Sequence, residues 1–240
     1  MHAADKTAPR PCPSPPLVVG TIHSAGALAC ALCLKPGAVD LLELRVDAFA
    51  SRPKLLQSLA VAVPNLKTPL LLTVRHPMEG GASALPLSRR KALFGQFLPF
   101  VQWADFEVRS LDGLRAEIAE ARNLGVRLVV SDHHFKGTPS LRRLRERLAR
   151  ARSVSPAVAK VAATVRTPVE LERLLSFLNW GERQSAGGLS IMGMGAYGQI
   201  SRLVLGRCGS VLNYGYLDRP QVPGQWPAEL LKQRLLELTD

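Results

Sequence analysis

The stretch Pro156-Ala157-Val158-Ala159-Lys160-Val161-Ala162-Ala163-Thr164-Val165 places one lysine in an otherwise apolar run of small and β-branched residues. Side chains of a β-strand alternate between its two faces, so Val158, Lys160 and Ala162 share a face that points into a core if the strand is buried. Burial disfavours the ammonium form and lowers the pKa of a lysine, and a neutral amine in a dry pocket can form a Schiff base with a carbonyl group. Lys160 is therefore a candidate nucleophile. The alternative is a lysine at a strand end whose ammonium group reaches solvent.

Apolar runs of this kind recur along the chain and alternate with segments of helical periodicity. The helical patterns cover residues 88–100, 114–123, 140–152 and 168–178, and Thr167 is a plausible N-cap before Pro168. Eight strands that alternate with helices predict a single (β/α)8 TIM barrel in the α/β class. The candidate strands are residues 17–23, 41–49, 69–76, 103–109, 127–135, 157–164, 188–194 and 210–216.

The domain organisation follows from the position of the first strand. We expect a flexible, proline-rich tail over residues 1–16 and one catalytic barrel domain over residues 17–240. So short a leading segment leaves little room for an N-terminal hairpin that plugs the barrel floor, and its prolines disfavour one. We therefore predict that a regular plug is missing.

Composition and charge exclude some functions. The chain has 240 residues, of which 47% are hydrophobic and 21% charged, enough to bury a large core. The formal net charge of +12 fits nucleic acid, an anionic small molecule or an arginine-rich proteome. The densest basic run, residues 142–152, keeps Leu144, Leu148 and Ala151 at helical spacing and lacks interleaved aromatic residues. We interpret it as the solvated face of an amphipathic helix and expect no nucleic-acid partner.

The cysteines and the N-terminus bear on the cellular compartment. Cys30 and Cys33 have the spacing of a redox pair, but they lie in a helical stretch and no second pair completes a zinc site, so we expect buried, reduced thiols. Residues 1–16 lack the apolar region of a secretion signal, and no segment approaches the length of a membrane span. A cytoplasmic enzyme without a membrane partner is the expectation.

Charged side chains gather near the ends of the predicted strands, which is where the active site of a (β/α)8 barrel forms. Charges at alternate positions of apolar strands must either pair with one another or line a wet interior. These residues are Glu43, Arg45 and Asp47 on the second strand, Arg75 on the third with Glu79 after it, Asp105, Glu107 and Arg109 on the fourth, and Asp132, His133 and His134 on the fifth.

A Schiff base acidifies the neighbouring carbon, so Lys160 needs a base beside it. His133 ends the strand that precedes the lysine strand, and imidazole suits proton transfer near neutral pH. His134 should point to the opposite face, so only one of the two can serve, and Glu79 could orient the imidazole that acts. Arginines such as Arg202 suit an anionic or polyhydroxylated substrate, although Arg45 and Arg75 could equally pair with carboxylates inside the barrel.

These residues, in this order, resemble the type I 3-dehydroquinate dehydratase family over nearly the whole chain. The resemblance implies a hydro-lyase of the shikimate pathway, and thus of aromatic amino acid biosynthesis, that converts 3-dehydroquinate to 3-dehydroshikimate. It also implies a homodimer, and no metal or organic cofactor, because the lysine is itself the electron sink. The fragments that carry it are Glu43-Leu44-Arg45-Val46-Asp47, Thr73-Val74-Arg75 followed by Glu79-Gly80-Gly81, Asp105-Phe106-Glu107, Ser131-Asp132-His133-His134-Phe135, the Lys160 strand, Met194-Gly195-Ala196-Tyr197-Gly198-Gln199-Ile200-Ser201-Arg202 and Pro223-Gly224-Gln225.

By the same resemblance each site residue has an expected role. Lys160 forms the imine with the C3 ketone, and His133 removes a C2 proton and later assists departure of the C1 hydroxyl, with Glu79 as its acidic partner. Arg202 and Gln225 bind the substrate carboxylate. The remaining expected contacts, to substrate hydroxyls or to the pocket wall, come from Glu43, Arg45 and Arg75.

Two positions depart from the family pattern. Gln221 stands where a serine is common in a loop that closes over the substrate, and His134 stands where an aspartate is frequent. A bulkier amide can still hydrogen-bond to substrate, so Gln221 is included among the substrate-binding residues. The departures keep a non-catalytic, ligand-binding homologue open as an alternative, and a class I Schiff-base aldolase would use the same lysine.

Overall fold

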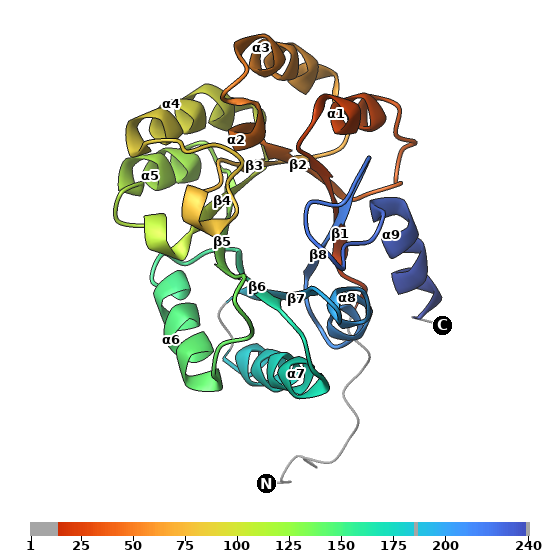
Figure 1. The fold of residues 1–240 in the computed structure, drawn as a ribbon. Helices are drawn as coiled ribbons and strands as arrows, with labels where there is room; N and C mark the ends of the chain where they lie inside the picture. The colour runs from red at the N-terminus through yellow and green to blue at the C-terminus, as the bar shows by residue number, and fades with distance from the viewer. Residues whose placement is uncertain (1–13, 185–186, 239–240) are drawn as a thin grey trace, which may run out of the picture.

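In the computed structural model the chain is described over residues 14–184 and 187–238, and these residues form a ring of parallel strands surrounded by helices (Figure 1). The predicted (β/α)8 barrel is confirmed. Most of the tail expected over residues 1–16 lies outside the described residues, and the first element within the described residues is β1. The strands are β1 (Leu17–Ile22), β2 (Leu41–Arg45), β3 (Leu70–Thr73), β4 (Trp103–Glu107), β5 (Arg127–His134), β6 (Val158–Thr164), β7 (Gly188–Met194) and β8 (Leu212–Tyr216).

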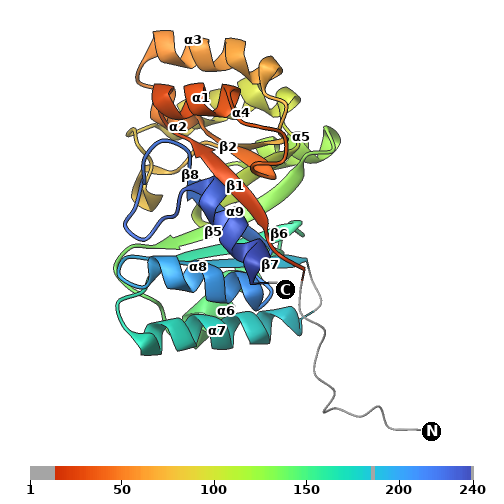
Figure 2. The same cartoon turned by 90° about the vertical axis from the view of Figure 1, so that its right-hand side faces the viewer.

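Helices cover the outside of the ring (Figures 1 and 2). The α-helices are α1 (Ala25–Leu32), α2 (Val46–Phe49), α3 (Pro53–Ala62), α4 (Leu87–Phe97), α5 (Arg115–Asn123), α6 (Leu141–Arg152), α7 (Pro168–Glu182), α8 (Gly198–Arg207) and α9 (Ala228–Glu237). Short 3-10 turns are η1 (Val63–Asn65), η2 (Pro77–Glu79), η3 (Leu98–Phe100) and η4 (Val108–Ser110). The Thr167 hydroxyl accepts a hydrogen bond from the Glu170 N–H and caps α7, as its sequence predicts.

The strands pair in the order β7-β6-β5-β4-β3-β2-β1-β8, every neighbouring pair being parallel. Two serine hydroxyls help to join the remaining strands, β7 and β8. The Ser190 hydroxyl donates to the Leu212 carbonyl at 2.8 Å, and the Ile191 N–H donates to the Ser210 hydroxyl at 2.8 Å. These bonds close the barrel where regular pairing is interrupted.

The period-two alternation of the strands divides the buried residues into two cores. One apolar cluster lies between strands and helices and includes Leu44, Phe106 and Val161. The second lies inside the barrel and includes Val158 and Ala162. Because Lys160 is between these two positions on the same face of β6, its side chain is directed into the barrel, as the sequence pattern predicts.

Three predicted strands end two or more residues earlier than expected at the rim of the barrel, the second at Arg45, the third at Thr73 and the fourth at Glu107. β2 stops at Arg45 because the chain turns into α2, where the Asp47 carboxylate accepts hydrogen bonds from the backbone N–H groups of Arg75 and Ala82. β4 stops at Glu107, whose carboxylate accepts from the N–H of His76. Both carboxylates therefore organise the loops above the strands, and Asp47 does not continue the strand pattern of β2.

Of the two predictions made for surface segments, the one for the basic run is confirmed and the one for the cysteine pair is wrong. The basic run 142–152 does lie on an amphipathic helix, α6, which buries Leu144, Leu148 and Ala151. The expectation of buried thiols is wrong for Cys30 and Cys33, which are unpaired but exposed, because α1 turns that face away from the barrel. None of the helices in the described part of the chain is long and apolar enough to cross a membrane.

Candidate functional site

Lys160 lies inside the barrel on β6 and is 4% exposed. Its Nζ atom donates to Asp105 Oδ2 at 3.0 Å and sits 3.8 Å from the centre of the Tyr214 ring. Burial lowers the pKa of Lys160, and the Asp105 carboxylate opposes that shift. The alternative of a lysine that reaches solvent is therefore wrong, and the amine is easier to deprotonate than a surface lysine.

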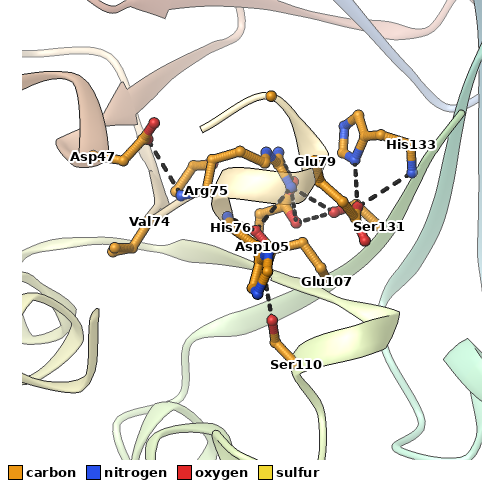
Figure 3. Close-up of polar contacts among 12 residues, drawn as sticks. Asp47, Val74, Arg75, His76, Glu79, Asp105, Glu107, Ser110, Ser131 and His133 are labelled. Atoms are coloured by element: carbon orange, nitrogen blue, oxygen red, sulfur yellow. Dashed lines mark hydrogen bonds and ion pairs between the residues drawn. The ribbon is translucent and has the colours of Figure 1, made fainter. Parts of the chain in front are cut away.

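A buried network of charges surrounds Arg75 (Figure 3) and includes Asp105, the partner of Lys160. Arg75, 2% exposed, donates to Asp105 Oδ2 at 2.9 Å and to the Ser131 hydroxyl at 2.8 Å. Its guanidinium also lies 3.4 Å from Glu107 and 3.8 Å from Glu43. Although burial opposes ionisation, Arg75 and then Lys160 hold the pKa of Asp105 well below its usual range. Asp105 is thus a permanent anion shared between two cations.

His133 and Glu79 form a second pair at the mouth of the barrel (Figure 3). The Nδ1 atom of His133 lies 2.9 Å from Glu79 Oε2, and the His133 N–H donates to the same oxygen at 3.2 Å. Burial, followed by the charges of Arg75 and Lys160, lowers the pKa of His133 well below its usual value. The imidazole is therefore neutral at neutral pH, the form in which it can accept a proton.

Glu79 is the group of this pair that titrates near neutrality. Burial is the main cause that raises its pKa to about 7, and the carboxylates of Glu107 and Asp132 act in the same direction. Arg75 and a 2.9 Å ion pair with Arg109 oppose the shift. When Glu79 is ionised it accepts from the Nδ1–H of His133, which leaves Nε2 as the basic nitrogen.

His134 points away from this pair, as the alternation of β5 requires. Its Nε2 lies 2.7 Å from Asp132 Oδ2, and Arg147 of α6 donates to the same carboxylate oxygen at 3.0 Å. Of the two imidazoles, His133 lines the cavity that contains Lys160 and His134 does not.

Arg202 of α8 brings a buried positive charge to the cavity. It is 2% exposed, and its guanidinium donates to the Tyr214 carbonyl at 2.8 Å and to the Gly224 carbonyl at 3.2 Å. Within residues 14–184 and 187–238 no carboxylate forms an ion pair with it, and burial lowers its pKa to about 10. It remains charged at pH 7, so the site is prepared for an anion.

The loop between β8 and α9 lies on the side where the strands end (Figure 2), and its residues Gln221, Val222 and Gln225 line the cavity. Gln221 accepts a hydrogen bond from Arg45 Nη1 at 2.6 Å, and its own N–H donates to Gln225 Oε1 at 2.8 Å. Arg45 is held in turn by both oxygens of Asp47, each at 2.9 Å. The side chain of Gln221 thus links the loop to the end of β2, the second strand from β8 around the barrel.

All the predicted site residues line one cavity of about 250 Å³. Sequence reasoning missed several of its lining residues, among them Thr21, Met192 and Tyr214, which occupy inward positions of β1, β7 and β8. These residues could have been found from the sequence, because they stand at the alternate positions of their strands that face the inside of the barrel. The described part of the chain holds no cluster of three metal-binding side chains. The predicted residues in the cavity are Glu43, Arg45, Arg75, Glu79, His133, Lys160, Arg202, Gln221 and Gln225.

Comparison with known proteins agrees with this geometry. A model of the type I 3-dehydroquinase family matches residues 16–239. The 3-dehydroquinate dehydratase of Thermodesulfovibrio yellowstonii is 30% identical over 186 residues, covering 78% of this chain and 80% of that protein. The enzyme of the same name from Albidiferax ferrireducens is 34% identical over 224 residues, covering 89% and 83%.

Solved structures resemble the barrel as a whole. The type I 3-dehydroquinate dehydratase of Clostridium difficile superposes with a TM-score of 0.84 at 24% identity, covering 94% of this chain and 93% of that one. The 3-dehydroquinate dehydratase of Geobacillus kaustophilus gives a TM-score of 0.80 at 26% identity, covering 93% and 91%.

Proposed function

The chain belongs to the type I 3-dehydroquinase family, and from this premise we propose that Lys160, His133 and Glu79 carry out the family's reaction. That reaction is the dehydration of 3-dehydroquinate to 3-dehydroshikimate through a lysine Schiff base, a step of the shikimate pathway that leads to aromatic amino acids. The observation that carries the assignment is the buried Lys160 in one cavity with a neutral His133 and with Arg202, which has no carboxylate partner among the described residues.

Lys160 opens the reaction. Its neutral amine adds to the C3 ketone, and the resulting carbinolamine loses water to give an iminium ion. Burial lowers the pKa of Lys160 and so increases the fraction of neutral amine. The Asp105 carboxylate at 3.0 Å then stabilises the positive charge that returns to the nitrogen when the iminium forms.

His133 handles the protons. Its neutral imidazole removes a proton from C2, and the electron pair of the broken C–H bond moves toward the iminium nitrogen to give an enamine. The imidazolium then donates this proton to the C1 hydroxyl, which leaves as water while the enamine electrons form the new double bond. Hydrolysis of the iminium releases the product and regenerates Lys160. Ionised Glu79 keeps Nδ1 protonated throughout, so Nε2 is the nitrogen that exchanges the proton.

Arg202 and Gln225 are proposed to hold the substrate carboxylate. A carboxylate would neutralise the buried guanidinium of Arg202 and gain charge-assisted hydrogen bonds in a site shielded from water. The loop that carries Gln225 also carries Gln221, which we place among the substrate contacts. Glu43 and Arg45 face the same cavity and are proposed to contact substrate hydroxyls, whereas Arg75 is committed to Asp105 and maintains the charge balance.

Two other functions remain as outcomes of the test. A class I aldolase would form an adduct with a sugar phosphate, and a non-catalytic homologue would form none. Incubation with 3-dehydroquinate and borohydride, followed by intact mass and peptide mapping, should give a ligand-sized adduct on the Lys160 peptide, and Lys160→Ala should give none. Failure of the native protein to form the adduct, with the fold intact, would contradict the proposed chemistry.

We also propose that the protein is a cytoplasmic homodimer. The family resemblance supports this assembly, and no helix in the described ranges could span a membrane. Light scattering on purified protein tests the dimer, since a monomeric mass at working concentration would refute it. Fractionation of the producing cells tests the location.

A further inference from the structure

Two residues that line the cavity have a buried hydroxyl without a hydrogen-bond partner in the described part of the chain: Tyr214 (OH) and Thr21 (Oγ1). Tyr214 is 4% exposed and Thr21 1% exposed. They come from β8 and β1, which are paired neighbours in the barrel. Tyr214 is opposite Val19, the inward-facing residue of β1 two positions before Thr21. Buried hydroxyls are nearly always hydrogen-bonded, so two unpaired ones on neighbouring strands of the cavity wall indicate groups that bind a ligand.

Tyr214 is close to the reacting amine. The centre of its ring lies 3.8 Å from Lys160 Nζ. Burial, with a contribution from the carboxylates of Glu43 and Asp105, raises the pKa of the phenol well above its usual value. The hydroxyl therefore stays protonated and available as a donor. The neighbouring carboxylates have other partners, since Glu43 accepts from Thr73 at 2.8 Å and Asp105 from Lys160 and Arg75.

The chemistry of the substrate shows which atom this donor would meet. Once Lys160 is bonded to C3, that carbon is one bond away from Nζ, the atom on which the Tyr214 ring is packed. The polar groups of 3-dehydroquinate closest to C3 are the ketone oxygen, which is lost as water, and the hydroxyl on C4, which persists through the reaction. The C4 hydroxyl is thus the lasting partner within reach of the phenol.

We propose that Tyr214 donates a hydrogen bond to the C4 hydroxyl of the substrate, with the Thr21 hydroxyl as a second contact to it. Tyr214 is then a specificity-determining residue of the site. It selects ketones that carry an adjacent hydroxyl, in addition to the carboxylate selection proposed for Arg202. This inference rests on the proposed function, because that function supplies the substrate and its attachment to Lys160.

A thermodynamic cycle tests the contact. We compare the native protein with Tyr214→Phe, using 3-dehydroquinate and its analogue lacking the C4 hydroxyl. The loss of one neutral hydrogen bond should lower kcat/KM for 3-dehydroquinate about 2- to 13-fold. The native protein should lose a similar factor with the analogue, and Tyr214→Phe should lose nothing further with it. Tyr197→Phe is the matched control, since Tyr197 does not line this cavity, and it should behave as the native protein does.

Other outcomes overturn the proposal. Equal kcat/KM for native protein and Tyr214→Phe with 3-dehydroquinate would show that the hydroxyl makes no contact. A loss that is equally large with the analogue, or a shifted pH profile, would show that the hydroxyl acts on Lys160 instead. If Tyr214→Phe does not fold, Thr21→Val replaces it in the same cycle with the same criteria.

The experiments distinguish a wrong inference about Tyr214 from a wrong proposed function. If the native protein dehydrates 3-dehydroquinate and Tyr214→Phe has the same kcat/KM for this substrate as the native protein, only the Tyr214 contact is refuted. A native protein that neither turns over 3-dehydroquinate nor forms the borohydride adduct refutes the function, and the inference falls with it.

Discussion

The Nδ1 atom of His133 lies 2.9 Å from Glu79 Oε2, and the two groups have pKa values displaced in opposite directions. Burial lowers the pKa of the imidazole and raises that of the carboxyl to about 7. A histidine would ordinarily titrate near pH 6.5 and a glutamate far below it. In this pair the carboxyl, and not the imidazole, is the group that changes charge near neutral pH.

The pH dependence of turnover should therefore follow Glu79. Ionised Glu79 accepts from Nδ1–H and leaves Nε2 basic, so protonation of Glu79 as the pH falls through about 7 removes that arrangement. We expect kcat/KM to decline on the acidic side of pH 7. Glu79→Gln should lower kcat roughly 10²-fold, with KM little changed, and should abolish this decline. A native profile that is flat from pH 8 to pH 5.5 would contradict the assignment.

His133 and His134 should respond differently to substitution. His133→Ala removes the base and should lower kcat about 10²- to 10⁴-fold, while borohydride still traps the imine on Lys160. His134→Ala breaks only the contact with Asp132 and should leave kcat within about twofold, with a fall in stability of about 1 kcal/mol. Steady-state kinetics and thermal unfolding measure both effects. The assignment of the base is wrong if His134→Ala is the variant that loses turnover.

Substitution of Arg202 should weaken substrate binding without lowering the stability of the fold. Arg202→Met removes the proposed carboxylate contact and should raise KM roughly 10- to 150-fold, since a hydrogen bond to a charged group contributes about 1.5–3 kcal/mol. The same change removes a buried charge that lacks a carboxylate partner among the described residues, so the Tm at pH 7 should be retained or increased. Burial lowers the pKa of Arg202 in the folded protein to about 10. The buried charge of Arg202 therefore destabilises the native protein below that pH, and this destabilisation is relieved as the pH rises through it. A large fall in Tm would show that Arg202 is mainly structural.

Much of this site is predictable from the sequence, because strand periodicity places Lys160 inside a barrel and separates His133 from His134. The pairing of Lys160 with Asp105 is less accessible, since it joins residues 55 positions apart through tertiary packing. The role of Tyr214 is harder still. Tyrosine is common in strands, and only the assembled barrel reveals that this cavity-lining residue has a buried hydroxyl without a partner among the described residues. Strand ends were misplaced for a related reason, because the rim carboxylates bind backbone groups of distant loops.

Gln221 provides the test of loop closure. Its side chain accepts from Arg45 at 2.6 Å and its N–H donates to Gln225 at 2.8 Å, so it ties the β8–α9 loop to the end of β2. Gln221→Ala should release that link and raise KM about 5- to 20-fold, because the hydrogen bond involves a charged donor. The effect on kcat should be small, since no reacting atom is touched. Arg219→Ala is the matched control, because Arg219 is an exposed residue of the same loop that does not line the cavity, and its KM should be unchanged. Gln221→Ser keeps a shorter hydrogen-bonding group, so its KM should fall between the native and alanine values; equal KM in all four proteins would mean that the link to Arg45 does not control closure.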